Sequence, residues 1–114
     1  MENSSVGVTV LIAALLLPAL AVQAAYAGDA SAGKAVYTDK CMLCHGANGE
    51  GATGYAQAMG LQPARLSSDR VQGKTDAELK KIILQGSGKM KPVKGLSDID
   101  IDNVIAYVRN FRKK

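Results

Sequence analysis

The residues with the clearest chemical potential form one short segment, Cys41-Met42-Leu43-Cys44-His45. Two thiols separated by two residues, followed directly by an imidazole, match the C-x-x-C-H pattern of covalent haem c attachment. In that chemistry the thiols add across the two vinyl groups of the haem, and the imidazole lies beneath the iron. We therefore predict one covalently bound haem c per chain, held by Cys41, Cys44 and His45, with His45 as an iron ligand.

Three other interpretations of this segment compete with haem attachment. A redox-active pair of the thioredoxin kind needs a βαβ context, and the sequence lacks one. A zinc site needs four ligands, and two cysteines and one histidine would require carboxylates to complete it. A structural disulfide leaves His45 unexplained. Haem attachment accounts for all three side chains.

The second axial ligand has to come from another residue type, a methionine or a lysine, because His45 is the only histidine. Met42 lies between the attaching cysteines and cannot reach the other haem face. Met59 lies in an apolar segment, where we expect it to pack as methionines ordinarily do. Met90 lies between two lysines in a Gly-rich loop ending at Pro92, with no helical face to pack on. Because a thioether is a haem ligand, we predict Met90 rather than Met59 as the second ligand.

The N-terminal segment has the composition of an export signal. Residues 6–27 carry no charge, include the aliphatic run 10–17, and end in Ala25-Tyr26-Ala27, which is an A-x-A cleavage pattern. The usual positive n-region is missing, since residues 1–5 contain Glu2 and no Lys or Arg. An uncleaved membrane anchor is the alternative, because residues 6–27 nearly span a bilayer.

We expect residues 1–27 to be a cleaved signal peptide and residues 28–114 to be one domain in the periplasm, without stable membrane insertion. A thylakoid lumen or a membrane-anchored periplasmic location are the alternatives. Cleavage leaves 87 residues and removes one acid, which raises the net charge from +4 to +5. A domain of that size buries a modest core and often needs a cofactor or a cross-link to be stable. The lysines and arginines are dispersed, which argues against a nucleic-acid-binding arm.

The elements that must position these residues are predicted to be helices separated by long loops. Asp29 can cap a helix that extends to about Lys40, in which Gly33 suggests the close approach of another helix. Residues 46–73 are rich in glycine and have no sustained period, with a short helix around residues 55–59.

Two further helices are predicted in the C-terminal half. Thr75 and Glu78 form a capping box for a helix that Gly86 ends. Ser97 caps the last helix, whose apolar positions form one stripe that includes Ile101, Val104, Ile105, Val108 and Phe111. No alternating strand pattern appears, so the domain is predicted to be all-α.

Together these residues resemble a small bacterial class I c-type cytochrome with one haem ligated by His and Met. The resemblance rests on the C-x-x-C-H segment, on Gly88-Lys89-Met90-Lys91-Pro92, and on Leu96-Ser97-Asp98 leading into the last helix. It implies the class I cytochrome c fold, with three to five short helices around one covalently attached haem. It also implies that the first and last helices cross at Gly33, Tyr37, Val104 and Tyr107, and that the Pro63 carbonyl accepts the N–H of the ligand histidine.

The implied function is soluble one-electron transfer between respiratory or photosynthetic redox partners, and not an enzyme activity, because His45 and Met90 would fill both axial positions. The alternative is a haem subunit, or a peroxide-reactive or small-molecule-binding haem protein with a labile Met90. Lys89, Lys91 and Lys94, extended by Lys80 and Lys81, are expected to steer partners with acidic docking surfaces to a monomer. Ordinary solvated lysines are the alternative interpretation.

Overall fold

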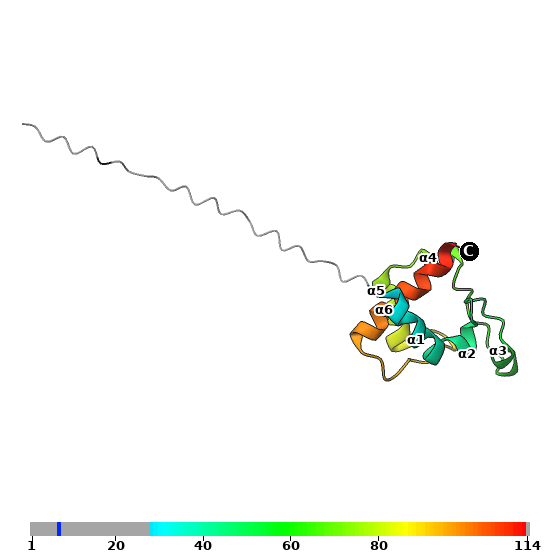
Figure 1. Cartoon of the computed structure of the whole chain (residues 1–114). Coiled ribbons are helices and arrows are strands. Elements are labelled where there is room, and N and C mark those ends of the chain that lie inside the picture. Colours follow the sequence, from blue (N-terminus) through cyan, green and yellow to red (C-terminus); the bar gives the residue numbers. More distant parts are fainter. Residues whose placement is uncertain (1–6, 8–27, 114) are drawn as a thin grey trace, which may run out of the picture.

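The computed structural model describes Gly7 and residues 28–113, and the rest of the predicted signal peptide lies outside the described residues. The chain order is α1 (Ala30–Lys40), α2 (Met42–His45), α3 (Gly54–Ala58), α4 (Asp69–Gln72), α5 (Asp76–Gln85) and α6 (Asp98–Arg109), followed by a 3-10 turn at Asn110–Lys113 (Figure 1). Residues 28–113 contain no β-strand, only an isolated bridge between Ser87 and Met90. The predicted all-α class is confirmed.

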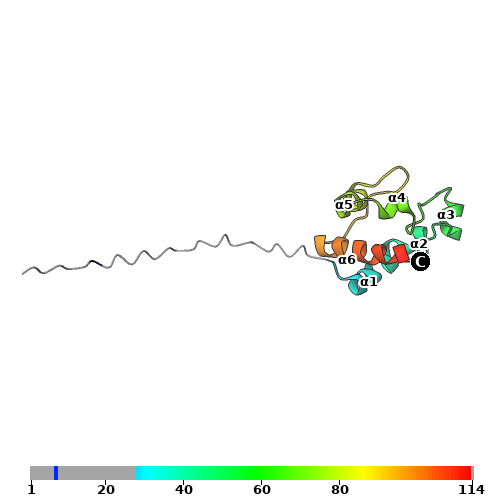
Figure 2. The same ribbon diagram turned by 90° about the horizontal axis from the view of Figure 1, so that it is seen from above.

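Helix α6 is the centre of the domain, with α1 on one side and α5 on the other (Figure 2). At the α1–α6 crossing, a methyl group on Gly33 would overlap the Asn103 carbonyl and meet Cβ of Tyr107. Glycine is therefore required there by the approach of the two backbones. The predicted crossing at Gly33 and Tyr107 is confirmed.

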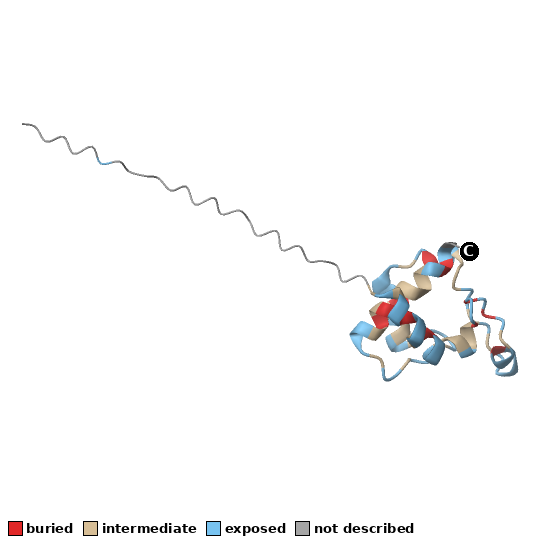
Figure 3. Ribbon diagram, in the orientation of Figure 1, coloured by how far each residue is buried: buried red, intermediate tan, exposed pale blue. Residues whose placement is uncertain are grey.

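The buried residues follow α6 and divide into two clusters (Figure 3). In the first, Tyr37 and Phe111 pack with Val104, and the rings of Tyr37, Tyr107 and Phe111 have centroids 5.2–5.5 Å apart. Such tilted and edge-on aromatic pairs add stability beyond the area they bury. The second cluster joins α4, α5 and α6 through Val71, Leu79, Ile101 and Ile105.

The helix ends follow the capping signals in the sequence. The Asp29 carboxylate accepts hydrogen bonds from the first backbone N–H groups of α1, and both Thr75 and Ser97 form capping boxes, with Glu78 and Asp100 respectively. Gly86, at φ +78°, ends α5. These caps define where α1, α5 and α6 begin and where α5 ends, and so where the loops between these helices lie.

The long Gly-rich segment is more ordered than its sequence predicts. It contains α4, which the sequence analysis did not predict, and Gln72 Nε2 donates to the backbone carbonyls of Leu66 and Val108. The guanidinium of Arg109 donates to the carbonyls of Gln72 and Lys74 and to Asp76. These bonds hold the turn between α4 and α5 against the end of α6.

Candidate haem site

The three predicted attachment residues lie on one turn of helix at the end of α1. Cys41 ends α1 and precedes α2, and its carbonyl accepts the His45 N–H at 3.0 Å. Cys41, Cys44 and His45 are all partly buried, whereas the Leu43 side chain is 61% exposed. The turn therefore directs the two thiols and the imidazole away from solvent, and both thiols are free.

Hydrogen bonds from three directions fix this turn. The Tyr37 hydroxyl donates to the Gly46 carbonyl at 2.5 Å, and the Gly51 N–H donates to the His45 carbonyl at 2.8 Å. The Thr53 hydroxyl donates to the Leu43 carbonyl at 2.9 Å. These supporting residues were not predicted as part of the site, although Thr53 carries the signal of a helix cap and indeed caps α3.

Burial sets the protonation of the site. It raises the pKa of the Cys41 thiol to about 11, with a further contribution from Cys44. Reactive and metal-binding cysteines have a lowered pKa, so the Cys41 environment does not resemble a thiolate site. Burial lowers the pKa of His45, and the nearby Ala64 backbone offsets part of this shift.

The His45 imidazole has one ring nitrogen that no protein group of the described residues satisfies. Its Nδ1 is buried and has no hydrogen-bond partner, which is unusual for a buried polar atom. A neutral imidazole of this kind suits iron coordination, and the free thiols on the same turn suit thioether attachment. The residues present therefore fit a covalently bound haem.

The Pro63 carbonyl does not accept a hydrogen bond from His45 Nδ1, contrary to the expectation drawn from the family. Its oxygen points at Gly51, where a Cβ would lie 2.5 Å away. The carbonyl is thus packed against the loop that returns from α2, and the backbone that influences the imidazole is that of Ala64.

Met90 lies at the end of a tight turn that follows α5. Ser87 and Met90 exchange backbone hydrogen bonds of 2.9 Å in both directions, and Gly88 between them has φ +54°. A positive φ at this position is the reason for a glycine in such a turn. Met90 is partly buried. The two backbone hydrogen bonds with Ser87 define the position of its backbone.

Met59 does not pack as the sequence analysis expected. Its side chain is 59% exposed at the end of α3. The exposure arises because Ala56, and not Met59, faces the interior of this short helix.

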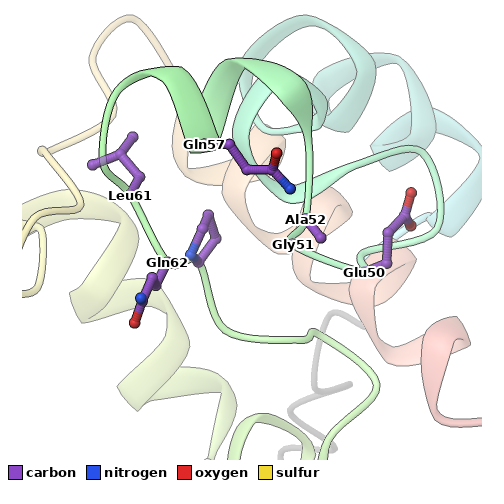
Figure 4. A pocket seen from close by; sticks show the side chains of 7 residues that line it. Glu50, Gly51, Ala52, Gln57, Leu61 and Gln62 are labelled. Atoms are coloured by element: carbon purple, nitrogen blue, oxygen red, sulfur yellow. The ribbon is translucent and has the colours of Figure 1, made fainter.

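Two cavities open along the segment that contains α3. One of about 290 Å³ is lined by residues 50–52 before α3, by Gln57 within it, and by residues 61–63 after it (Figure 4). The other, of about 350 Å³, lies at Gly60, Gln62 and Lys89. The second cavity marks where the Met90 turn comes close to α3.

Comparison with known proteins decides the family. Residues 28–108 match the family model described as cytochrome c oxidase, cbb3-type, subunit III. The chain belongs to this family of c-type cytochromes. A c-type haem, bound covalently, is the cofactor of such domains, and the predicted haem c and cytochrome identity are confirmed.

Two curated relatives and one solved structure support this assignment. Cytochrome c-554(547) of Halothiobacillus neapolitanus is 38% identical over 91 residues, 75% of this chain and 100% of that protein. The cbb3-type cytochrome c oxidase subunit CcoP of Azospirillum brasilense is 31% identical over 87 residues, 75% of this chain but 29% of CcoP. The KustC0563 c-type cytochrome shares the fold, with a TM-score of 0.58 and 24% identity over 69% of this chain and 95% of that chain.

The surroundings of the site add three findings, on charge, on metal ligands and on membrane spans. Lys80 pairs with Asp98 at 3.3 Å, so it is not a free member of the basic set predicted around Met90. Within residues 28–113 no three His, Cys, Asp or Glu side chains gather as a metal-ligand group. Across the same residues, no helix combines the length and apolar content that a membrane span requires.

Proposed function

We propose that this cytochrome is a soluble one-electron carrier of the periplasm, with haem attached through Cys41 and Cys44 and iron ligated by His45 and Met90. The bound haem supplies the chemistry, which is cycling of its iron between the ferrous and ferric states. The observation that carries the proposal is that two free thiols and a partly buried imidazole lie on one helical turn. Residues 1–27 would direct export and be removed.

The chain's own residues give this site its rigidity. The hydrogen bonds from Tyr37, Gly51 and Thr53 hold the α2 turn, so the backbone that carries the imidazole is fixed. The Ser87–Met90 hydrogen bonds do the same for the thioether ligand. If His45 and Met90 both hold the iron, no position would remain on it for a substrate, which supports a carrier and not an enzyme.

The ligand assignment is tested by comparing Met90→Ala with Met59→Ala. Met90→Ala should abolish the charge-transfer band of a Met–Fe bond in the red region of the ferric spectrum and allow carbon monoxide to bind the ferrous form. Met59→Ala, at the exposed end of α3, should retain the band. Loss of the band in Met59→Ala and its retention in Met90→Ala would reverse the assignment.

The second candidate function is a haem subunit of an oxidase. It is favoured by the 31% identity to CcoP, which is named as a subunit of a cbb3-type oxidase. Sedimentation of the purified chain with and without a cbb3-type oxidase separates the two roles. A carrier remains a monomer that binds the oxidase weakly and reversibly, whereas a subunit co-sediments with it at any salt concentration.

A further inference from the structure

We propose that Lys89 is a positioning residue, whose ammonium group straps the Met90 turn to the end of α3 and so limits dissociation of Met90 from the iron. The contact is the hydrogen bond from Lys89 Nζ to the Gly60 carbonyl at 3.1 Å. The inference rests on the proposed ligation by His45 and Met90.

The first step concerns how the Met90 turn is anchored. On its α5 side the loop is held by its own backbone, since the Val93 N–H donates to the Ile83 carbonyl at 2.8 Å. A Cβ on Gly86 would lie 2.5 Å from the Met90 carbonyl, so the turn is also folded closely against the end of α5. These contacts join the Met90 turn to α5, and they do not join it to α2 or α3.

The second step concerns the gap that an axial pair must bridge. His45 belongs to residues 41–64, and Met90 belongs to residues 79–97. Among the hydrogen bonds of these two described segments, the Lys89–Gly60 contact is the one that joins them. A haem held by His45 and Met90 would lie between these two segments, so this contact would join the two sides of the site.

The third step concerns what lies beneath the contact. Gly60 and Lys89, together with Gln62, line the cavity of about 350 Å³, so the contact lies at the edge of a cavity. Gly60 has φ +66°, a backbone conformation that aims the turn after α3 and costs little only for glycine. The acceptor is therefore held by the backbone and not by a flexible side chain.

Lys91 provides a matched comparison on the other side of Met90. It is exposed, and none of the hydrogen bonds or ion pairs of the described residues includes its side chain. Lys89 makes the hydrogen bond to the Gly60 carbonyl and Lys91 makes no such bond. The two lysines share charge, exposed position and distance in sequence from Met90.

The test measures how fast imidazole replaces Met90 in the ferric protein, followed by loss of the Met–Fe band. Imidazole is used because its neutral form is insensitive to the charge removed. At saturating imidazole the rate is limited by Met90 dissociation, and Lys89→Ala should raise it about two- to fivefold, as for an exposed charged contact. Lys89→Arg should restore the wild-type rate, and Lys91→Ala should leave it unchanged.

Two results would overturn the proposal. If Lys89→Ala has the wild-type rate, or if Lys91→Ala accelerates replacement equally, the contact does not restrain Met90. Absence of the Met–Fe band from the wild-type protein would instead refute the ligand assignment, and the strap with it. Before imidazole is added, Lys89→Ala should show the full band, which separates a faster dissociation from a lost ligand.

Discussion

Tyr37 joins the core to the haem site within one side chain. Its ring is 1% exposed and packs against Tyr107 and Phe111, and its hydroxyl donates to the Gly46 carbonyl, one residue after His45. Burial is the main reason that the pKa of this phenol lies above its usual value, with Cys41 adding to the effect. The neutral hydroxyl is thus part of the folded structure.

Tyr37→Phe should lower the free energy of unfolding at pH 7 by about 1–2 kcal/mol, because the Gly46 carbonyl loses a buried donor. The pKa of Tyr37 is raised in the folded state above the unfolded value of about 10, so its contribution is complete below pH 10 and declines as the pH rises beyond that. The difference between wild type and variant should therefore shrink above pH 10. Denaturant unfolding at pH 7, 9 and 11 measures it, and a difference that stays constant with pH would contradict the assignment.

The attachment residues were predictable because their pattern is contiguous, so that residue types and spacing alone define the chemistry of Cys41, Cys44 and His45. Other polar roles depend on partners far away in sequence. The Asn103 side chain accepts the Asp29 N–H at 2.8 Å, although the two residues are 74 positions apart in sequence. In the sequence, Asn103 is one of several polar residues of α6. Nothing local indicates that this amide is buried.

At the scale of elements, the α1–α6 crossing depends on a position without a side chain. Gly33 costs helix stability within α1, about 1 kcal/mol relative to alanine. Glycine is nevertheless needed at this position because the Asn103 carbonyl occupies the space that a methyl group would fill.

Gly33→Ala should therefore lower the free energy of unfolding by about 1–3 kcal/mol, although alanine is the better helix former. Gly54→Ala is the matched control, since Gly54 is also helical, has no positive φ, and has nothing within 4 Å of an added Cβ. It should leave stability unchanged or slightly higher. Equal destabilisation of the two variants in guanidinium titrations would show that the crossing is not the cause.

The helices with strong caps were predicted from sequence, and the ordered part of the Gly-rich segment was not. A capping box involves residues that are close in sequence, so Thr75 and Ser97 predict where α5 and α6 begin. By contrast, α4 has four residues and depends on Gln72 and Arg109 contacting distant carbonyls. The same dependence on distant contacts explains the mistaken expectation for Pro63.

At the scale of the whole molecule, the protein core is small. The described residues include eight buried apolar side chains, of which seven divide between two clusters and the eighth, Ala56, lies outside both. A domain this size gains much of its stability from a bound group.

A Cys41→Ala/Cys44→Ala double variant should therefore be largely unfolded, because it loses covalent attachment and with it the haem contribution to folding. Far-UV circular dichroism measures the loss of helix. Met90→Ala, which leaves the attachment residues in place, should keep its colour and most of its helix. A colourless double variant with the wild-type dichroism spectrum would show that the protein core is sufficient.

Charge near the Met90 turn should control encounters with anionic partners. Lys91 and Lys94 are exposed near Met90, so the Lys91→Glu/Lys94→Glu variant should react more slowly with ferricyanide at low salt. The effect should fade near physiological ionic strength, where the Debye length is about 8 Å.

Lys34→Glu/Arg70→Glu makes the same change in net charge on α1 and α4, both outside the turn, and is the control. Stopped-flow oxidation of the ferrous protein at several salt concentrations gives the comparison. If both double variants slow the reaction equally, net charge and not the position of the lysines steers the encounter.

The α1–α6 crossing also has a consequence in time. The first helix of the domain packs on the last, and Tyr37 completes its cluster only with Val104 and Phe111. A ribosome or an export channel delivers the chain from its N-terminus, so α1 and the cysteine turn emerge long before their packing partner. Until residues 98–111 have been made, α1 lacks the packing partner that completes this cluster. The position of the crossing thus delays the packing of α1 until the end of the domain has been made.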